Sequence, residues 1–401
     1  MKKLLLIGFF FISFLTQGQK VTISAKVVDA ETSEPLGFAS VSLKSKSMGT
    51  ITNEVGEFDF HIPTDNRNDL LMISMLGYES YEAPAWTLLD NNDQIIKLNK
   101  ATLFLDEVVV SETLKGSDIL LIALSNVDKN YPMQPYMVEG FYRDLKKVGG
   151  TYVSLLEAAV KIYDENYNAP RNKFKLLERV NLLEVRRSLG YGNKFTSYFD
   201  EDNLLEDLLL HNTVRYRQFP EDEEFMTHLV RGKDSHYNGK AVYVLTNKMA
   251  YSLSLFIDKK SYAIIHLEYE NNQELPLGKR KGLESRFVNV KRTLDFKSFE
   301  GKMYLNYLTV DSKINWYNIK TKHLMFETSL RQQLLVNEVH PNTGEWIGST
   351  QKMKDYGLQY QDLPYNKEFW ANYNVIKESP LEENIIHDLE REMPLEKQFE
   401  N

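Results

Sequence analysis

The sequence predicts a mainly β fold, in which a small N-terminal β-sandwich precedes a larger curved antiparallel sheet or half-barrel with a few helices. Two observations lead to this prediction. The 401 residues include 23 Tyr and 21 Phe, and flat aromatic side chains pack well on pleated strands. Apolar and polar residues also alternate through many short segments separated by turns, as they do in antiparallel strands with one buried face.

Residues 1–19 have the pattern of a secretory signal peptide. Two lysines precede an apolar run from Leu4 to Leu15, and small or polar residues follow it. The run is too short to span a bilayer, so we expect cleavage just before Gln19 or Lys20 and an exported mature protein. A retained membrane anchor is the alternative interpretation.

The composition restricts the classes of chemistry that are open to the chain. It contains no Cys, which excludes disulfides, thiolate metal sites, cysteine nucleophiles and a lipid-bearing cysteine. The formal net charge is −8. Phosphates would be repelled by such a protein except at a local basic patch, so we expect no nucleic-acid partner.

Residues 20–112 contain the short strands of the predicted sandwich. Alternation places apolar residues on one face of the segments 21–27, 39–43 and 58–62, with glycines at the turns. The more continuous apolar run 70–78 is expected to form a central strand. Short strands separated by turns at this interval predict a small β-sandwich.

Several pieces of this region resemble the carboxypeptidase-regulatory-like domain, a prealbumin-type sandwich found at the front of many envelope proteins of the Bacteroidetes group. The resembling pieces are VVDAETSEPLGFASVSLK, GTITNEVGEFDFHIP, LLMISMLGYES and LDEVVVSE. The resemblance implies a structural or interaction module, because the regulatory domain of carboxypeptidases is not the catalytic one. Ala25 and Ser33 stand where the family usually has Gly, and the turn at Ser33 is strained if it requires a positive φ.

The segment LDEVVVSETLKG also resembles the segment that leads into the plug of TonB-dependent outer-membrane transporters. A transporter of that kind needs hundreds of further residues for a large barrel. The remaining residues are too few and show no plug pattern. We therefore favour a regulatory-like domain over a transporter.

Residues 113–401 are predicted to begin with a helix. Ser117 is a suitable N-cap, apolar residues recur at helical spacing as far as Tyr131, and Pro132 ends the pattern. A second helix is expected from Leu381 to about Arg391, where it would cover a sheet edge or an open mouth.

Between these helices the sequence predicts roughly eight to ten strands in succession, which must curl to protect their faces and edges. Turns are expected at Gly149-Gly150 and at residues 258–261, and the segment 203–214 is either a helix or an insertion. The result is an antiparallel meander that forms a curved sheet or half-barrel.

The second region is similar to an uncharacterised envelope family that follows such regulatory-like domains. The resembling pieces are YPMQPYMVEGFYRD, EVRRSLGY, DLPYNKEFWANYNVIKESPLEENI and EKQFEN. The hairpins around YSLSLFIDKKSYAIIHLE also resemble those of lipoprotein-carrier half-barrels. These resemblances imply a location in the envelope and no particular activity.

Signatures of catalysis are scarce. His387 and Glu390 have the spacing by which one helical turn offers two zinc ligands, but no His follows as a third ligand. A polar face on a terminal helix explains the pair better. The commonest motifs of metalloproteases, serine hydrolases and nucleotide enzymes are all absent from the sequence. We assign no catalytic residue, metal ligand or cofactor, although folding can still assemble a site from distant residues.

Alternation places the carboxylate of Glu157 on an apolar strand face, together with Val153, Leu155 and Ala159. Such a group needs a partner or a cavity. The partners available nearby in sequence are Arg143, Arg186 and Arg187. A paired core Glu or a solvent-exposed edge position is the structural explanation. The functional hypothesis is a ligand site, in which guanidinium groups at the mouth of an apolar half-barrel bind the head group of an anionic amphiphile.

Phe369, Trp370 and Tyr373 lie close together near the C-terminus. Core or interface packing explains them better than a platform for stacking carbohydrate.

These observations predict an exported, non-catalytic protein in the periplasm or at the periplasmic face of the outer membrane. It would bind or carry a lipid or other amphiphile, or contact an outer-membrane protein partner. An accessory protein for glycan or nutrient uptake beside a TonB-dependent transporter is the second hypothesis, and a hydrolase with an unrecognised site is the third. Clustered exposed aromatic residues would favour the second hypothesis, and a deep apolar cavity would favour the carrier.

Overall fold

The structure is a computed structural model, and it confirms a mainly β fold. The residues it describes are 20–89, 94–101, 114–192, 196–199, 203–237, 239–249, 251–353, 357–361, 363–378 and 380–400. The proposed signal peptide and the LDEVVVSE segment lie outside these described residues. Within them, no helix combines the length and the apolar character that crossing a membrane requires.

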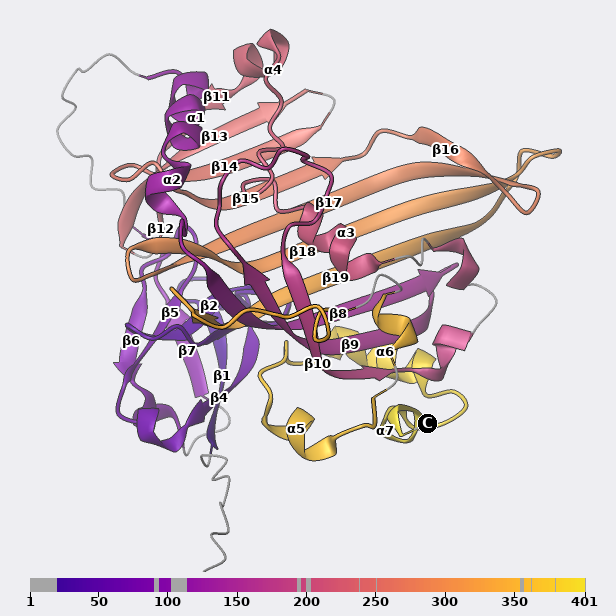
Figure 1. The fold of residues 1–401 in the computed structure, drawn as a ribbon, viewed down its shortest axis with the longest axis horizontal. Coiled ribbons are helices and arrows are strands. Elements are labelled where there is room, and N and C mark those ends of the chain that lie inside the picture. The colour runs from indigo at the N-terminus through magenta and orange to yellow at the C-terminus, as the bar shows by residue number, and fades with distance from the viewer. Residues whose placement is uncertain are drawn as a thin grey trace, which may run out of the picture.

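The N-terminal region forms two small sheets that share one apolar core. Strands β4, β1 and β7 form the first sheet, and β3, β2, β5 and β6 form the second (Figure 1). Their bounds are β1 Lys20–Asp29, β2 Ser40–Leu43, β3 Gly49–Ile51, β4 Glu57–Pro63, β5 Leu70–Ser74, β6 Tyr81–Pro84 and β7 Gln94–Leu98. Ile23, Val41, Phe58, Phe60 and Ile73 are fully buried between the sheets, so the alternation in the sequence identifies the core face correctly.

Two details of the sandwich follow from its local chemistry. Ser33 has a φ of 60°, so its turn does use the left-handed conformation that usually selects Gly. The Asp29 carboxylate supports this turn by accepting hydrogen bonds from the backbone N–H groups of Glu31 (2.8 Å) and Thr32 (2.9 Å). Strand β7 pairs with β1 in parallel, although the sequence pattern predicted antiparallel strands. The chain reaches β7 from the other sheet, and such a crossover permits parallel pairing.

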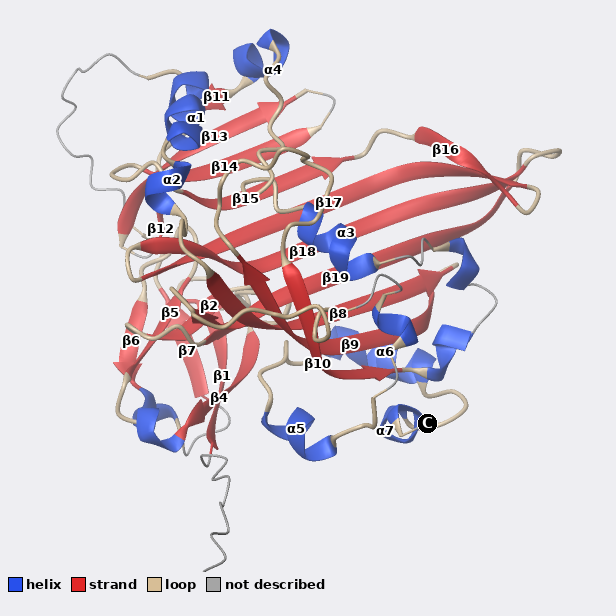
Figure 2. Cartoon of the chain, viewed as in Figure 1, coloured by secondary structure: helices blue, strands red, loops and turns tan. Residues whose placement is uncertain are grey.

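The second region is built on one open sheet of twelve strands, all paired antiparallel. The order of the main path is β10-β9-β8-β19-β18-β17-β15-β14-β13-β11, with β12 beside β13 and β16 beside β17 (Figure 2). The bounds are β8 Tyr136–Val148, β9 Thr151–Asp164, β10 Arg179–Arg187, β11 Val230–Arg231, β12 Ser235–Tyr237, β13 Lys240–Lys248, β14 Ser252–Asp258, β15 Ile264–Asn271, β16 Leu275–Arg280, β17 Leu283–Phe299, β18 Lys302–Asn318 and β19 Leu324–His340. The predicted turns at Gly149-Gly150 and residues 258–261 connect β8 to β9 and β14 to β15.

Short helices flank the large sheet. They are α1 Gly116–Ser125, α2 Val127–Asn130, α3 Leu204–Leu210, α4 Glu223–His228, α5 Lys367–Asn372, α6 Pro380–Leu389 and α7 Leu395–Phe399. The expected N-cap, Ser117, lies inside α1, where the Asp118 carboxylate accepts a hydrogen bond from the N–H of Lys115 (3.1 Å). The predicted first helix is also divided, because the Asn126 side chain donates to the carbonyl of Ile122 (2.9 Å) and its backbone leaves the helical region.

The two faces of the large sheet contact different parts of the chain. The inner face carries Leu294, Leu308 and Leu334, which pack with α1 and α3 in the largest apolar core. The outer face carries Phe141 and Leu335, which pack against Ile51 of the sandwich and against the C-terminal segment around α5. The sandwich and the C-terminal helices therefore share one face of the sheet, and the other face is left for short helices and loops (Figure 1).

Candidate functional site

A cavity of about 960 Å³ lies on the inner face of the large sheet. Its floor comes from the central strands β14 to β19, and its cover comes from α3 and the loops around residues 173–174 and 218–220. The lining is mostly apolar. Its large apolar side chains include Phe174, Leu204, Phe219, Leu253, Leu267, Leu275, Leu277, Phe287, Val290, Val310, Ile314 and Leu330. A cavity of this size and lining suits the apolar part of a small molecule.

Helix α3 forms the cover because its sequence, LLEDLLL, places apolar residues toward the sheet. The Asn203 side chain caps the helix by accepting a hydrogen bond from the N–H of Glu206 (3.3 Å). Leu205, Leu208 and Leu209 are buried against the inner face. The segment that the sequence left as a helix or an insertion is therefore a helix over the cavity.

Arg292 is the most unusual charged group in the cavity lining. It lies in β17 on the same face as Val290, and its Nε is buried without a hydrogen-bond partner among the residues that the structure describes. Its guanidinium carbon stands 5.1 Å from the centre of the Tyr269 ring. Burial lowers the pKa of Arg292, and only the nearby Tyr269 opposes this effect. The guanidinium remains charged and has no carboxylate partner within the described chain.

His211 lies in the same lining. Burial, together with the positive charge of Arg292, lowers the pKa of His211 to about 3. The imidazole is therefore neutral at pH 7 and offers one donor and one acceptor. Lys173 and Asp207 are the other charged residues in the lining as described. The cavity thus combines a large apolar volume with a small group of polar side chains.

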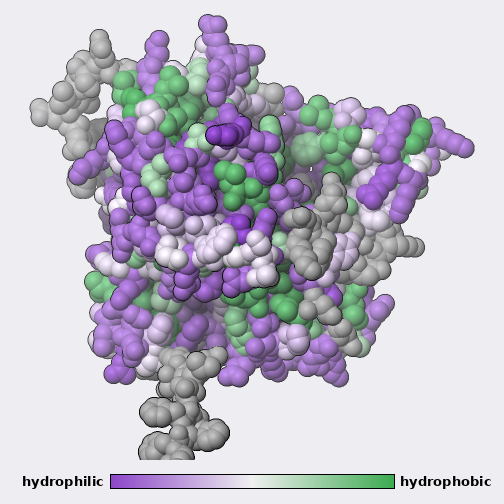
Figure 3. Space-filling model, in the orientation of Figure 1, coloured by the Kyte–Doolittle hydropathy of each residue, from purple (hydrophilic) through white to green (hydrophobic). Residues whose placement is uncertain are grey.

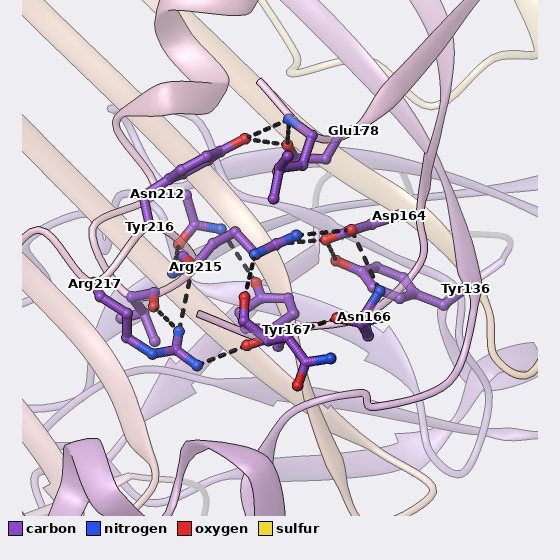
Figure 4. Close-up of polar contacts among 12 residues, drawn as sticks. Tyr136, Asp164, Asn166, Tyr167, Glu178, Asn212, Arg215, Tyr216 and Arg217 are labelled. Carbon is purple, nitrogen blue, oxygen red and sulfur yellow. Dashed lines mark hydrogen bonds and ion pairs between the residues drawn. The ribbon is translucent and has the colours of Figure 1, made fainter. Parts of the chain in front are cut away.

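A buried polar network holds the loops beside the cavity cover in place (Figure 4). The carboxylate of Asp164 accepts two hydrogen bonds from the guanidinium of Arg215, at 2.6 and 3.0 Å. Arg215 also donates to the carbonyl of Asn168 (3.0 Å), and the Tyr216 hydroxyl donates to Glu178. This network joins the loop after β9 to the loop after α3, so it fixes two chain segments that cover the inner face.

The structure brings three of the four sequence-predicted site residues together, but on the outer face. The carboxylate of Glu157 accepts a hydrogen bond from Nε of Arg143 and another from Nε of Arg186, both at 2.6 Å. Burial alone would raise the pKa of Glu157, but the two guanidinium groups outweigh it and lower the pKa below its ordinary value. Arg186 also stacks on the Trp370 ring, at 4.4 Å from its centre.

A small void adjoins this ion triad. Arg143 and Glu157 border a space of about 20 Å³ beneath α6 and α7, which is about the size of one water molecule. Arg187 points to the opposite face of β10 and donates to the carbonyls of Gln359 (3.1 Å) and Gln361 (2.6 Å). A ligand-binding role for these four residues stays a prediction, and none of them lines the large cavity.

The sequence held a signal for Arg292 that resembles the signal for Glu157. Alternation places Arg292 between Val290 and Leu294 on an apolar strand face. The pattern alone does not single out Arg292, because Arg286 and Lys291 place further basic residues in the same strand.

The C-terminal aromatic residues pack as expected. Trp370 and Tyr373 are buried, and Trp370 packs edge-on against Phe141 with ring centres 6.4 Å apart. The Tyr373 hydroxyl donates to the carbonyl of Gly140 (2.9 Å). Helix α6 packs beside them on β9, where Asp388 accepts a hydrogen bond from the N–H of Tyr152 (3.0 Å). It therefore covers the outer face rather than the cavity mouth.

A second cavity of about 500 Å³, with several charged residues in its lining, lies between the sandwich and the outer face. Six of its charged or titratable residues form two paired clusters, one around Arg331 and one around His266. Arg331 donates to Asp311 (2.6 Å). His266 lies 3.2 Å from Asp295, and although burial lowers its pKa, hydrogen bonds to Asp295 and Glu268 raise the pKa to about 9.

Glu139, Glu338 and His340 form a group that could hold a metal ion, since one ligand atom of each lies within 4.8 Å of the others. The ammonium of Lys161 stands 3.0 Å from the Glu139 carboxylate and already supplies positive charge there. The His340 imidazole, 3.7 Å away, and the Lys161 ammonium lower the pKa of Glu139 to about 2. Glu139, His340 and Lys161 therefore form an ion-pair network.

Solved structures with some likeness to this chain include three envelope or lipid-related proteins. An outer membrane lipoprotein-sorting protein domain from Vibrio parahaemolyticus has a TM-score of 0.22 and 15% identity, covering 57% of this chain and 93% of that one. Lipovitellin has a TM-score of 0.25 and 8% identity, covering 58% and 28%. MucB in complex with MucA has a TM-score of 0.18 and 9% identity, covering 57% and 100%. These TM-scores are too low to establish a shared fold.

The N-terminal part of this chain is similar in sequence to a known receptor and to a known domain family. The TonB-dependent receptor SusC of Bacteroides thetaiotaomicron is 33% identical over 107 residues, which are 27% of this chain and 10% of the receptor. The chain therefore spans about a tenth of the length of this curated relative. The model of the CarboxypepD_reg-like domain matches residues 23–110. This range includes nearly all of the strands β1 to β7 of the two-sheet sandwich, so the chain carries a CarboxypepD_reg-like domain in its N-terminal part.

Proposed function

We propose that this protein is exported to the cell envelope and binds one anionic amphiphile in the inner-face cavity, either to carry it or to present it to an envelope partner. The proposed organisation is a signal peptide at 1–19, the regulatory-like sandwich at 20–112 and the cavity-bearing domain at 113–401. The binding step requires no catalysis.

The observation that carries this proposal is Arg292. An isolated charge in an apolar environment is strongly disfavoured unless it is paired. Arg292 has no carboxylate partner among the described residues and an unbonded, buried Nε. A guanidinium is the group best shaped to bind a carboxylate or phosphate through two parallel hydrogen bonds. A ligand with an anionic head would therefore supply the missing partner.

The lining supports an apolar tail on the same ligand. The cavity volume of about 960 Å³ is at the upper end of the roughly 300–1,000 Å³ range of small-molecule sites. Most of the lining is aliphatic or aromatic, and neutral His211 adds a hydrogen-bond donor and acceptor beside Arg292. An amphiphile with one or more hydrocarbon chains satisfies both features.

An envelope location is supported by the pattern of residues 1–19 and by the resemblance of the N-terminal domain to part of SusC. A carrier is favoured over an accessory protein for glycan uptake because the C-terminal aromatic cluster is packed inside the protein and an apolar cavity is present. The sandwich would serve as the contact with an envelope partner.

The test is native mass spectrometry of the full chain purified from its own envelope in mild detergent, followed by organic extraction. We expect a stoichiometric lipid with a carboxylate or phosphate head. The variant Arg292→Leu should lose roughly tenfold or more of the bound lipid, because hydrogen bonds to a charged group contribute about 1.5–3 kcal/mol. Its melting temperature should change little, since Arg292 has no carboxylate partner among the described residues and loses only its contact with the Tyr269 ring.

The matched control is Arg67→Leu, which removes an exposed Arg of the sandwich and should leave the lipid content unchanged. Glu157→Gln is measured beside it to test the ion triad. A protein that is empty in every preparation, or one whose lipid is unaffected by Arg292→Leu, would refute the proposal. Lipid lost only in Glu157→Gln, at an unchanged melting temperature, would move the site to the outer face.

A further inference from the structure

One end of the large sheet projects beyond the rest of the molecule as two neighbouring hairpin tips (Figure 1). The first tip joins β16 to β17, and the second joins β18 to β19. The N–H of Ile319 in the second tip donates to the carbonyl of Gly282 in the first (3.3 Å). Lys322 also lies 3.0 Å from Glu284. The two tips therefore form one surface, which we call the basic tip, made of residues 275–285 and 318–325.

The basic tip has a charge opposite to that of the whole protein. It contains five basic residues and one acidic residue, whereas the formal net charge of the chain is −8. The basic residues are Lys279, Arg280, Lys281, Lys320 and Lys322. The acidic residue, Glu284, contacts Lys322 from the tip and Arg286 from β17. A concentrated positive surface on an acidic protein attracts anionic partners selectively.

Apolar side chains stand exposed among these charges. Leu275, Leu277, Leu324 and Met325 are exposed by 48%, 56%, 53% and 55%. Single exposed apolar residues are ordinary on protein surfaces. Here, however, four exposed apolar residues and five cations lie together on one projecting end. Protein segments that insert at the interface of an anionic bilayer combine apolar and basic side chains in this way. Figure 3 shows hydrophilic side chains over the projecting arm, with a few hydrophobic ones between them.

The basic tip is continuous with the cavity. Leu275 and Leu277 belong both to the exposed tip and to the cavity lining. Phe287 and Ile314 extend the lining inward from the same end of the sheet. The rim of the cavity at this end is therefore formed by the same hairpin that carries Lys279 and Arg280.

We propose that the basic tip docks on the surface of an anionic lipid bilayer, with the four apolar side chains at the level of the head groups. The proposal that the tip docks on a bilayer depends only on the positive charges and exposed apolar side chains of the tip. Its purpose, to bring the cavity rim to the bilayer so that an amphiphile can enter or leave, rests on the proposed function.

A bilayer fits this surface better than an acidic protein does. A stable protein interface buries about 800 Å² on each partner, usually around a well-packed apolar centre. The basic tip consists of two narrow turns whose exposed apolar side chains occur as two pairs, Leu275 with Leu277 and Leu324 with Met325, beside the charged residues of each turn. A fluid head-group layer can surround such a shape without a complementary rigid surface.

The test is co-sedimentation of the full chain with vesicles of pure phosphatidylcholine or of phosphatidylcholine with phosphatidylglycerol. We expect binding only to the anionic vesicles and weaker binding at high salt. Two triple variants test the tip. The charge variant is Lys279→Glu, Arg280→Glu and Lys320→Glu. The apolar variant is Leu277→Ser, Leu324→Ser and Met325→Ser.

Each triple variant should weaken binding by roughly tenfold or more. The matched controls change exposed residues far from the tip and should bind like the unmodified chain. The charge control is Lys97→Glu, Lys129→Glu and Lys240→Glu, and the apolar control is Ile95→Ser, Leu121→Ser and Val230→Ser. Circular dichroism verifies that all four proteins are folded.

Absence of vesicle binding, or equal binding by tip variants and controls, would overturn the proposal. So would binding to polyglutamate in place of vesicles, which would indicate an acidic protein partner. Arg292→Leu should dock like the unmodified chain. Docking that depends on the tip in a protein without bound lipid would therefore support this inference and refute only the proposed function.

Discussion

At the scale of single residues, two charged groups on apolar strand faces differ in whether the fold supplies a partner. Glu157 is buried, but Arg143 and Arg186 each donate to it at 2.6 Å. Arg292 is on the opposite face of the sheet, and its Nε has no partner in the described part of the chain. Strand alternation marks both positions as unusual, and only the surrounding elements decide which one is satisfied within the protein.

The buried carboxyl group of Glu178 should make the free energy of unfolding depend on pH. Burial, assisted by the negative charge of Asp164, raises the pKa of Glu178 to about 7, from about 4.3 in an unfolded chain. The folded state therefore keeps a proton that the unfolded state releases. The proton on Glu178 stabilises the folded state fully at pH values below the pKa that Glu178 has in the unfolded chain. This stabilisation is lost as the pH rises through the folded-state pKa of about 7.

We therefore expect the free energy of unfolding to fall between pH 5 and pH 8 by up to about 3 kcal/mol on account of this group. Urea unfolding at the two pH values, with Tyr fluorescence as the readout, measures it. Glu178→Gln should remove most of the fall, while Glu221→Gln, at an exposed position on the same cover, should retain it. An equal fall in both variants would show that other groups cause the pH dependence.

At the scale of elements, the sandwich depends on close approach between a turn and a strand. Gly56 lies in the turn before β4 with a φ of 79°. A Cβ at this position would stand 2.4 Å from the carbonyl oxygen of Val27 in β1. The same carbonyl accepts a hydrogen bond from Leu36 (2.9 Å), and the N–H of Val27 donates to the carbonyl of Gly56 (2.7 Å). Neither the turn nor the strand can move without losing these bonds.

Gly56→Ala should therefore lower the free energy of unfolding by clearly more than the roughly 1–2 kcal/mol that a left-handed conformation costs a non-Gly residue. Gly149→Ala is the matched control, because Gly149 also has a positive φ (55°) but no atom within 4 Å of an added Cβ. Thermal unfolding of the two variants makes the comparison. Equal losses would mean that the turn at Gly56 has room to relax.

At the scale of the whole molecule, the C-terminal segment connects the sandwich to the large sheet. The Asn374 side chain accepts a hydrogen bond from the N–H of His61 in β4 (2.8 Å) and donates to the carbonyl of the same residue (3.1 Å). Its own carbonyl accepts a hydrogen bond from the side chain of Asn337 in β19 (2.8 Å). Nearby, Lys377 lies 3.0 Å from Asp59. The C-terminal segment around Asn374 therefore contacts both the sandwich and the large sheet through buried or half-buried polar groups.

We expect the sandwich and the large sheet to unfold in one calorimetric transition. Asn374→Ala should lower its midpoint and separate it into two steps, because a buried polar group left unsatisfied costs about 1–3 kcal/mol. Lys367→Ala, which removes an exposed ion pair with Glu396, should leave a single transition at nearly the same temperature. Two transitions in the unmodified protein would show that the sandwich and the large sheet unfold independently.

The sequence alone determined the local structure and the class of fold. Alternation located most strands, the glycine and polar turns located the hairpins, and the resemblance of the N-terminal pieces identified the regulatory-like domain that matches residues 23–110. These features depend on neighbours within a few residues, so one sequence is enough to indicate them.

Only the tertiary structure decided where the cavity is and which charges it contains. The large sheet is completed by pairing β8 with β19, which joins Met137 to His340 across the chain. Alternation gives each strand two faces but does not say what covers either one. The pairing of β9 with β8 and β10 places Glu157 between Arg143 and Arg186, and the sandwich and the C-terminal helices cover this outer face. The cover of the inner face leaves a cavity in which Arg292 has no carboxylate partner among the described residues and its Nε has no hydrogen-bond partner there.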